Sequence, residues 1–115
     1  MADTASSEAA VLARRAVAVA QILETLANAR RLVVLCKLVE WGEATVGSLA
    51  EASGLSQSAL SQHLAKMRQA ELLTYRRDGQ TLWYRIADPR IEQLIATLHD
   101  LFCAPATKMK KGKPR

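Results

Sequence analysis

The segment from residue 46 to residue 86 constrains the fold more than any other part of the chain. It reads VGSLAEASGLSQSALSQHLAKMRQAELLTYRRDGQTLWYRI. The side-chain oxygens of Thr45 and Ser56 can accept hydrogen bonds from the backbone N–H groups of a helix start, so they predict helices over 46–53 and 57–70. Gly54 supplies the turn between these helices. Two short helices joined by a turn that contains glycine predict a helix-turn-helix.

A β-hairpin is predicted directly after the second of these helices, within residues 72–86. Asp78-Gly79 is a strong signal for a tight hairpin turn. The residues around this turn suit short strands because they are aromatic or branched: Tyr75, Leu82, Trp83, Tyr84 and Ile86. A hairpin that follows a helix-turn-helix is typical of a winged helix, in which the hairpin is the wing.

Apolar helices are predicted on both sides of this segment. Residues 7–27 form a broad apolar stripe, made of Val11, Leu12, Ala16, Val19, Ile22, Leu23 and Leu26. Asn28 predicts the cap of a helix that Gly42 closes, and this helix has an apolar face of Leu32, Leu35, Cys36 and Val39. Asp88-Pro89 opens a last helix, 89–104. The predicted fold class is mostly α with a β-hairpin wing: a winged helix-turn-helix of four helices, two strands and a fifth helix.

The size and charge of the chain favour one small domain with a basic tail. A chain of 115 residues leaves little room for a deep catalytic cavity, and a dimer would help to bury its apolar helices. Residues 1–107, the predicted winged-helix domain, hold equal numbers of acidic and basic residues. Residues 108–115 hold five basic residues and no acidic one. We expect this tail to be disordered, and either to solubilise the protein or to attract polyanions.

Several classes of protein are excluded by the absence of their signals. The first residues lack a basic segment followed by an apolar run, which argues against a signal peptide. No apolar stretch approaches the ~20 residues that span a bilayer, so a cytoplasmic protein is expected. No Ser/His/Asp arrangement, glycine-rich phosphate loop or carboxylate pair stands out, so an enzyme is not expected.

The recognition helix, 57–70, combines an apolar side with a side rich in short polar groups. Leu60, Leu64 and Met67 are expected to pack against the core, and the polar residues are expected to face outward. Gln can form two hydrogen bonds with adenine, and Ser can donate to or accept from several base edges. The wing adds Arg76, Arg77, Gln80 and Arg85. The pair of arginines beside the tight glycine turn suits contact with the DNA backbone or the minor groove. The alternative is a solvated helix and hairpin tip. The predicted DNA-binding residues are Ser56, Gln57, Ser58, Ser61, Gln62, His63, Lys66, Arg68, Arg76, Arg77 and Gln80.

The run LAEASGLSQSALSQHLAKMRQAELLTYRRDGQTLWYRI resembles the core of the ArsR/SmtB family of winged-helix repressors. The resemblance extends over about residues 20–103. It implies a homodimer, joined by its terminal helices, that occupies an inverted-repeat operator in double-stranded DNA until an effector binds. It also implies that five residues of the recognition helix lie near the bases: Gln57, Ser58, Ser61, Gln62 and His63.

The chain departs from the metal-sensing members of this family. Thr45 and Gly47 stand where the founding members have cysteine ligands. The last helix offers acidic and histidine side chains without the repeated histidine spacing of the other metal site: Asp88, Glu92, His99 and Asp100. Neither metal site is expected. A site built from Cys36, Cys103 and His99 remains an alternative, because thiolates with imidazole can hold zinc or copper.

The two cysteines provide the candidate sensor. Cys36 and Cys103 are expected to be thiols at rest, and residue chemistry alone leaves them as either buried apolar groups or a redox pair. VLCKLVEWG and LHDLFCAP resemble the matching stretches of the dithiol, sulfur-responsive subset of the family (the BigR, SqrR and YgaV type). This resemblance implies a repressor that needs no cofactor. It would release its operator when persulfide, polysulfide or an oxidant crosslinks Cys36 to Cys103. The alternatives are a metal- or haem-responsive repressor with a Cys or His axial ligand, and a protein-interaction module with structural thiols.

Overall fold

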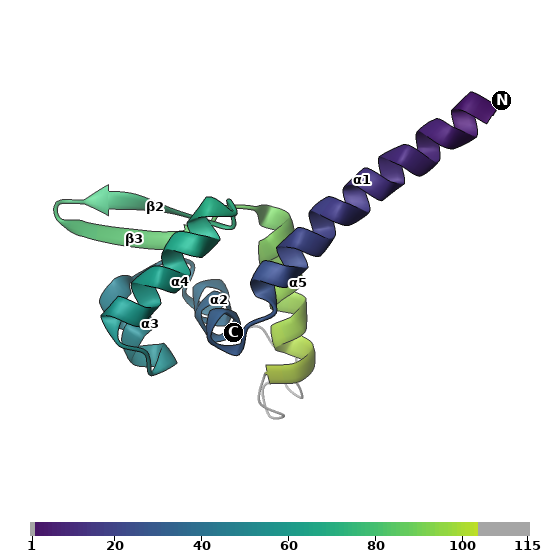
Figure 1. Cartoon of the computed structure of the whole chain (residues 1–115). Coiled ribbons are helices and arrows are strands. Elements are labelled where there is room, and N and C mark those ends of the chain that lie inside the picture. The colour runs from purple at the N-terminus through teal and green to yellow at the C-terminus, as the bar shows by residue number, and fades with distance from the viewer. Residues whose placement is uncertain (1, 104–115) are drawn as a thin grey trace.

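The computed structural model describes residues 2–103, with the side chains of residues 7–102, and it has the winged helix-turn-helix fold (Figure 1). Its elements are α1 (Ala2–Leu26), α2 (Ala29–Trp41), β1 (Ala44–Thr45), α3 (Val46–Ser53), α4 (Gln57–Gln69), β2 (Leu73–Asp78), β3 (Thr81–Ile86), α5 (Pro89–Leu98) and the π-helical turn η1 (His99–Cys103). The predicted fold class is therefore confirmed. The boundary predicted between 107 and 108, and the basic tail, lie outside the described residues.

The helix starts follow the predicted capping residues. The Asn28 side chain accepts hydrogen bonds from the backbone N–H groups of Arg30 and Arg31. Thr45 accepts from Ser48 N and Ser56 accepts from Ala59 N, so both short helices of the motif begin where the sequence predicts. Gly54 ends α3 with a φ of 72°, in the left-handed region that glycine adopts without steric cost.

The sheet differs from the predicted hairpin in two ways. It has three antiparallel strands in the order β1-β3-β2, because Ala44 and Thr45 pair with Tyr84 and Trp83. The turn between β2 and β3 is one residue later than the Asp78-Gly79 signal, since Asp78 pairs with Thr81 and leaves Gly79-Gln80 as the central pair. Gly79 has a φ of 66°, which fits a hairpin turn that needs glycine at its first central position.

The two terminal helices also differ from their predicted bounds. α1 begins at Ala2, five residues before the start that the apolar stripe indicated. The helix predicted over 89–104 ends as an α-helix at Leu98 and continues as the π-helical turn η1. At its start, Arg90 pairs with the capping carboxylate of Asp88, and this holds the pKa of Asp88 to about 2.

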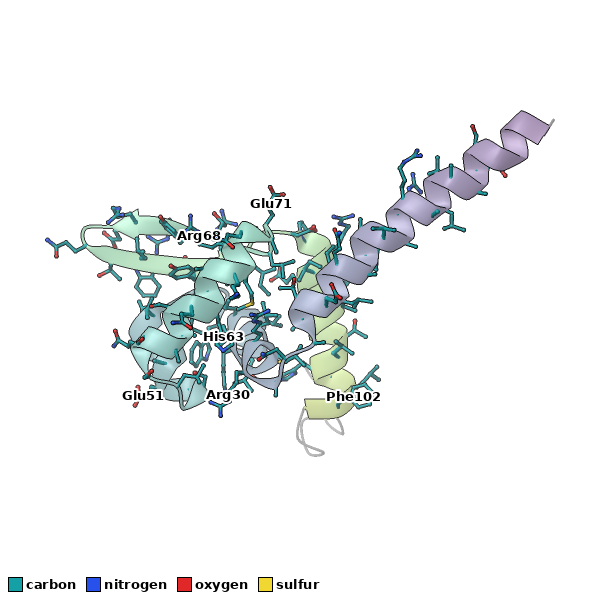
Figure 2. All side chains as sticks on the ribbon, viewed as in Figure 1. Arg30, Glu51, His63, Arg68, Glu71 and Phe102 are labelled. Atoms are coloured by element: carbon teal, nitrogen blue, oxygen red, sulfur yellow. The ribbon has the colours of Figure 1, made fainter. Side chains whose placement is uncertain are left out.

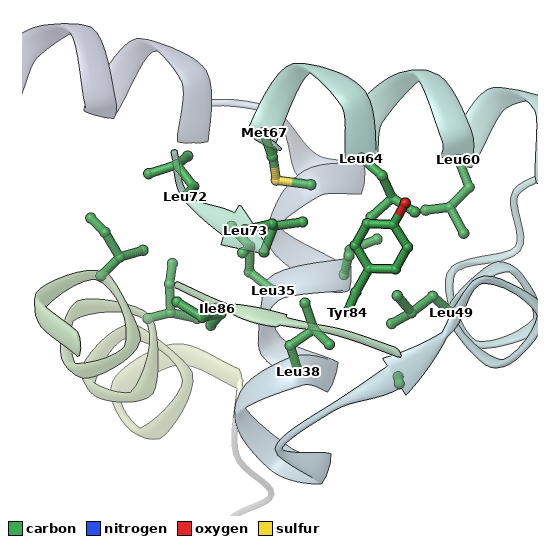
Figure 3. Close-up of a cluster of buried hydrophobic side chains, with 14 of the residues drawn as sticks. Leu35, Leu38, Leu49, Leu60, Leu64, Met67, Leu72, Leu73, Tyr84 and Ile86 are labelled. Carbon is green, nitrogen blue, oxygen red and sulfur yellow. The ribbon is translucent and has the colours of Figure 1, made fainter. Parts of the chain in front are cut away.

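One apolar core lies beneath the helix-turn-helix (Figure 3). Leu35 and Leu38 of α2, Leu49 of α3, and the three predicted apolar residues of α4 are all almost completely buried in it. The buried stripe of α2 is centred on Val34, Leu35 and Leu38. The other residues of the predicted face lie at its edge and are half-buried: Leu32, Cys36 and Val39.

The long helix α1 projects away from this core (Figure 1). Within its described side chains only Leu26 is buried, whereas Leu12 is 68% exposed and Val19 and Leu23 are about half exposed. The apolar stripe predicted for this helix therefore exists, but most of it is left exposed by the described residues of the protomer. Among the described helices, none has the length and apolar character needed to cross a lipid bilayer.

Truncation of Leu35 should destabilise the protein strongly. Leu35→Ala leaves a cavity at the centre of the core and should lower the free energy of unfolding by about 2–5 kcal/mol. Val33→Ala is the matched control, because Val33 lies on the same helix and is 40% exposed. Urea denaturation at one fixed protein concentration measures both. Equal effects of the two substitutions would contradict this description of the core.

Candidate nucleic-acid interface

The helix α4 has a buried apolar side and an exposed polar side. Leu60, Leu64 and Met67 are at most 1% exposed, as the sequence predicts. The polar side chains between them are exposed: Gln57, Ser58, Ser61, Gln62, Lys66 and Arg68. Because the apolar side is fixed in the core, the polar side is presented to solvent as a nearly rigid surface. Such a surface suits the edges of bases in the major groove.

Two edges border this exposed side, and each adjoins another element. Gln57, Ser61 and Arg68 follow one another around the helix at turn spacing and form the wing-side edge. There the Arg68 guanidinium lies 4.6 Å from the ring centre of Tyr75, at the start of the wing. Ala59, His63 and Lys66 form the opposite edge, next to the start of α2, which we call the α2-side edge. The recognition helix is therefore flanked by the wing on one side and by α2 on the other (Figure 2).

The arginines of the wing have different surroundings. Arg76 donates two hydrogen bonds to Glu43, with Nε–Oε1 at 3.0 Å and Nη2–Oε2 at 2.8 Å, and its guanidinium lies over the ring of Trp83. The Arg76 guanidinium lowers the pKa of the Glu43 carboxyl. Arg76 therefore anchors the wing to the segment before β1. In contrast, Arg77 and Gln80 are exposed near the tip of the hairpin.

His63 is bound to α2, which the sequence did not indicate. Arg31 Nε donates to His63 Nδ1 at 3.1 Å, and Arg31 Nη1 donates to the backbone oxygen of Thr25 at 2.9 Å. Arg31 thereby joins the end of α1 to the recognition helix. Partial burial lowers the pKa of His63, and the positive charges of Arg31, Arg30 and Lys66 lower it further.

Most of the predicted DNA-binding residues are exposed, but some of them are engaged in contacts within the protein. Ser56 caps α4, so its hydroxyl is committed to Ala59 N. Arg76, His63 and Arg68 make contacts within the protein, and the remaining predicted residues are exposed on α4 or the wing. Contact with DNA stays a prediction for all of them. Arg31 and Glu43 were missed because each acts on a partner more than 30 residues away in the chain.

The segments with the two cysteines are joined by a partly buried contact between Glu40 and His99. Cys36 is half-buried on α2 and packs against the core. Glu40, one turn later, lies with its Oε2 2.9 Å from Nε2 of His99, and His99 lies about one turn before Cys103. His99 is only 7% exposed, so this polar side chain is buried at the end of the last helix. The side chain of Cys103 lies outside the described side chains.

Glu40 also receives a second contact, from Lys37 at 3.3 Å. Partial burial raises the pKa of the Glu40 carboxyl, but the hydrogen bonds from Lys37 and His99 outweigh burial and lower it. Glu40 therefore stays ionised near neutral pH. Within the part of the chain that the structure describes, no three His, Cys, Asp or Glu side chains are grouped in a way that could hold a metal ion. The alternative site with Cys103 lies partly outside that range.

Comparison with known proteins gives consistent matches. The model of the family described as bacterial regulatory protein, arsR family, matches residues 28–75. The transcriptional activator HlyU of Vibrio cholerae is 43% identical over 82 residues, which are 71% of this chain and 75% of that protein. The biofilm growth-associated repressor of Agrobacterium fabrum is 39% identical over 92 residues, 80% of this chain and 78% of that protein. The crystal structure of the transcriptional repressor BigR from Xylella fastidiosa has a TM-score of 0.72 at 37% identity, and the match covers 82% of this chain and 95% of that one.

The Arg31–His63 contact predicts how His63 titrates. The pKa of His63 should lie below 6.5, and Arg31→Gln should raise it, because the substitution removes a positive charge and the donor to Nδ1. NMR titration of the imidazole C–H groups measures this pKa. Arg90→Gln is the control, since Arg90 is paired with Asp88 on α5. An unchanged His63 pKa in folded Arg31→Gln would contradict the contact.

The same shift has a consequence for stability. Because the folded-state pKa of His63 is lower than the unfolded-state value, protonation favours the unfolded chain. The contribution of His63 to stability is therefore full above about pH 6.5 and is lost as the pH falls through the folded-state pKa.

Proposed function

The chain belongs to the arsR family of bacterial regulatory proteins and is a DNA-binding transcriptional regulator, and from this premise we propose that it is a repressor controlled by Cys36 and Cys103. In this proposal the dithiol form occupies an inverted-repeat operator. Crosslinking of the two cysteines by reactive sulfur species or oxidants releases the DNA. The protein is a regulator and not an enzyme.

The observation that carries the sensor proposal is the contact between Glu40 and His99. Cys36 lies one turn before Glu40 on α2, and Cys103 ends the turn that begins with His99. The 2.9 Å contact therefore brings together the two helical turns that lead to the cysteines. A disulfide needs Cα atoms within about 7 Å, and bridges with additional sulfur atoms span longer gaps. This arrangement supports a crosslink between α2 and the end of the last helix.

When polysulfide is the oxidant, the proposed crosslinking reaction has two steps. One cysteine thiolate attacks a terminal sulfur of the polysulfide, becomes a persulfide and releases a polysulfide shorter by one sulfur atom. The second thiolate then attacks the sulfur bonded to the first cysteine, which forms the disulfide and releases hydrosulfide. In total the two thiols lose two electrons and two protons, and the polysulfide chain accepts the electrons. When a longer sulfur chain is retained, the bridge contains three or four sulfur atoms.

The position of α2 explains how such a bridge would act on DNA. Leu35 and Leu38 of α2 share one core with the apolar side of α4, so a displacement of α2 changes the support of the recognition helix. Two recognition helices must lie about 34 Å apart to occupy adjacent turns of one face of DNA. A change in that spacing weakens both contacts at once. Differential stability of a few kcal/mol is sufficient to move a regulator from mostly bound to mostly free.

The names of the relatives differ on whether the regulator activates or represses transcription. HlyU of Vibrio cholerae is called an activator, whereas the protein from Agrobacterium fabrum and BigR are called repressors. We favour repression because a compact winged helix that recognises DNA through α4 and the wing can block a promoter by occupancy alone. Activation would need a further contact with another DNA-bound protein.

A homodimer is the second part of the proposal, and the exposed side of α1 supports it. Leu12, Val19 and Leu23 recur at helical spacing, and each is at least half exposed. Leu101 and Phe102, at the other end of the described chain, are 61% and 79% exposed. These apolar side chains on the two terminal elements would be buried by a second copy of the protein.

Substitution of Cys36 tests the sensor. Cys36→Ser should bind operator DNA like the wild type when both are reduced, and polysulfide should release only the wild type. Fluorescence anisotropy follows release, and intact mass with a non-reducing peptide map identifies the bridge. Cys103→Ser should behave in the same way, and a reductant should restore binding of the wild type. Normal release of Cys36→Ser by polysulfide would exclude the proposed sensor.

Charges on the exposed side of α1 test the dimer. Leu12→Glu with Val19→Glu should give a monomer and weaken operator binding by roughly 100-fold or more, because the second recognition helix is no longer linked to the first. Light scattering coupled to size-exclusion chromatography measures the mass. Gln21→Glu is the control, since it adds one charge to an exposed polar position of the same helix. A dimer that survives the double substitution would place the interface elsewhere.

A further inference from the structure

A cluster of positive charge lies at the α2-side edge of the recognition helix. Lys66 and His63 belong to that edge, and Arg30 and Arg31 are the second and third residues of α2. Arg31 donates a hydrogen bond to His63, and the charges of Arg30, Arg31 and Lys66 all act on the His63 ring. Three cations from two separate elements therefore converge around one half-buried imidazole.

These cations have no counter-charge among the described side chains. Among the described residues, no carboxylate lies within ion-pair distance of Arg30, Arg31 or Lys66. Other cations of the same small domain are paired with Glu40, Glu43 and Asp88: Lys37, Arg76 and Arg90 respectively. Concentrated charge of one sign without counter-charges destabilises a folded chain and attracts anions. The cluster therefore has the properties of an anion-binding surface.

Arg31 is held in a fixed orientation within the cluster. Its Nε and Nη1 atoms donate to His63 and to the Thr25 carbonyl, which uses two of the five N–H donors of a guanidinium. Within the described part of the chain, no acceptor is found for the other three. A planar group with its orientation set and donors to spare suits the oxygens of a phosphate. Arg30 and Lys66 are both exposed.

The position of the cluster beside the recognition helix indicates that the anion it binds is the phosphate backbone of DNA. A recognition helix in the major groove lies between two phosphate backbones, one on each side. Arg68 and the wing lie on the wing-side edge of α4, so they face one backbone. The cluster lies on the opposite edge and would face the other. We propose that Arg30, Arg31 and Lys66 form a second backbone-binding site, which holds DNA phosphates on the side of the groove away from the wing.

This inference rests on the proposed function, since it adds α2 to the same DNA interface. Phosphate contacts have two measurable properties. They contribute equally on any sequence, and each one makes the slope of log affinity against log salt concentration more negative by about 0.9. A base contact has neither property. Salt dependence therefore separates a role of α2 in backbone binding from a role in sequence recognition.

The experiment uses reduced protein and two DNA duplexes. The first is selected by the wild-type protein from a random-sequence pool, and the second is a scrambled version of it. Anisotropy titrations between about 50 and 200 mM salt give the slopes. Arg30→Gln should weaken binding to both duplexes by a similar factor. It should also make the negative slope shallower by about 0.9 for each protomer bound. Arg30→Lys should keep most of the slope because it keeps the charge.

Two variants complete the design. Lys66→Gln should behave like Arg30→Gln, with an equal loss on both duplexes. Arg90→Gln removes the same charge from a residue that is already paired with Asp88 on α5, so its slope should match the wild type. If Arg30→Gln has the slope of Arg90→Gln while the wild type binds, the phosphate site is wrong and the proposed function stands. If the reduced wild type selects no duplex at all, both fail.

Discussion

The packing of α2 beneath the helix-turn-helix is the interaction on which the rest of the structure depends. A domain of this size has one core, and the side chains of Leu35 and Leu38 occupy its centre together with the apolar side of α4. That contact decides which side of α4 faces outward. It also fixes α3 and the sheet, because both pack on the same helix. The positions of the buried apolar residues of α4 therefore determine which of its polar residues face solvent.

The same helix makes the contacts that connect the other elements. At its first turn, Arg31 contacts the end of α1 and the recognition helix. At its last turn, Glu40 contacts His99 beyond α5. A helix of 13 residues is about 20 Å long and bends little, so a displacement at one end reaches the other almost undiminished. The proposed sensor residue Cys36 and the proposed phosphate contact at Arg30 lie on this one helix, so coupling between them would need no separate pathway.

Local signals predicted most of the fold. The caps at Asn28, Thr45 and Ser56 and the turn at Gly54 depend on neighbouring residues, so the sequence was sufficient to locate them. β1 was not predicted, because a pair of residues gives no periodic pattern and forms a strand only when β3 is beside it. The contacts of His63 and His99 were missed for a related reason, since their partners are 32 and 59 positions away. A histidine in a sequence gives no indication of which distant residue its side chain will contact in the fold.

The projecting helix α1 has a consequence for how the protein unfolds. Eight of its 25 residues are alanine, so its intrinsic helix propensity is high, but most of its described side chains are exposed. An isolated helix of this length in water is only partly formed and opens from its ends. Amide hydrogens in α1 of a solitary protomer should therefore exchange with solvent long before those of α2. The order of this helix would then depend on protein concentration, and the amount of protein in the cell would set how much of it is folded.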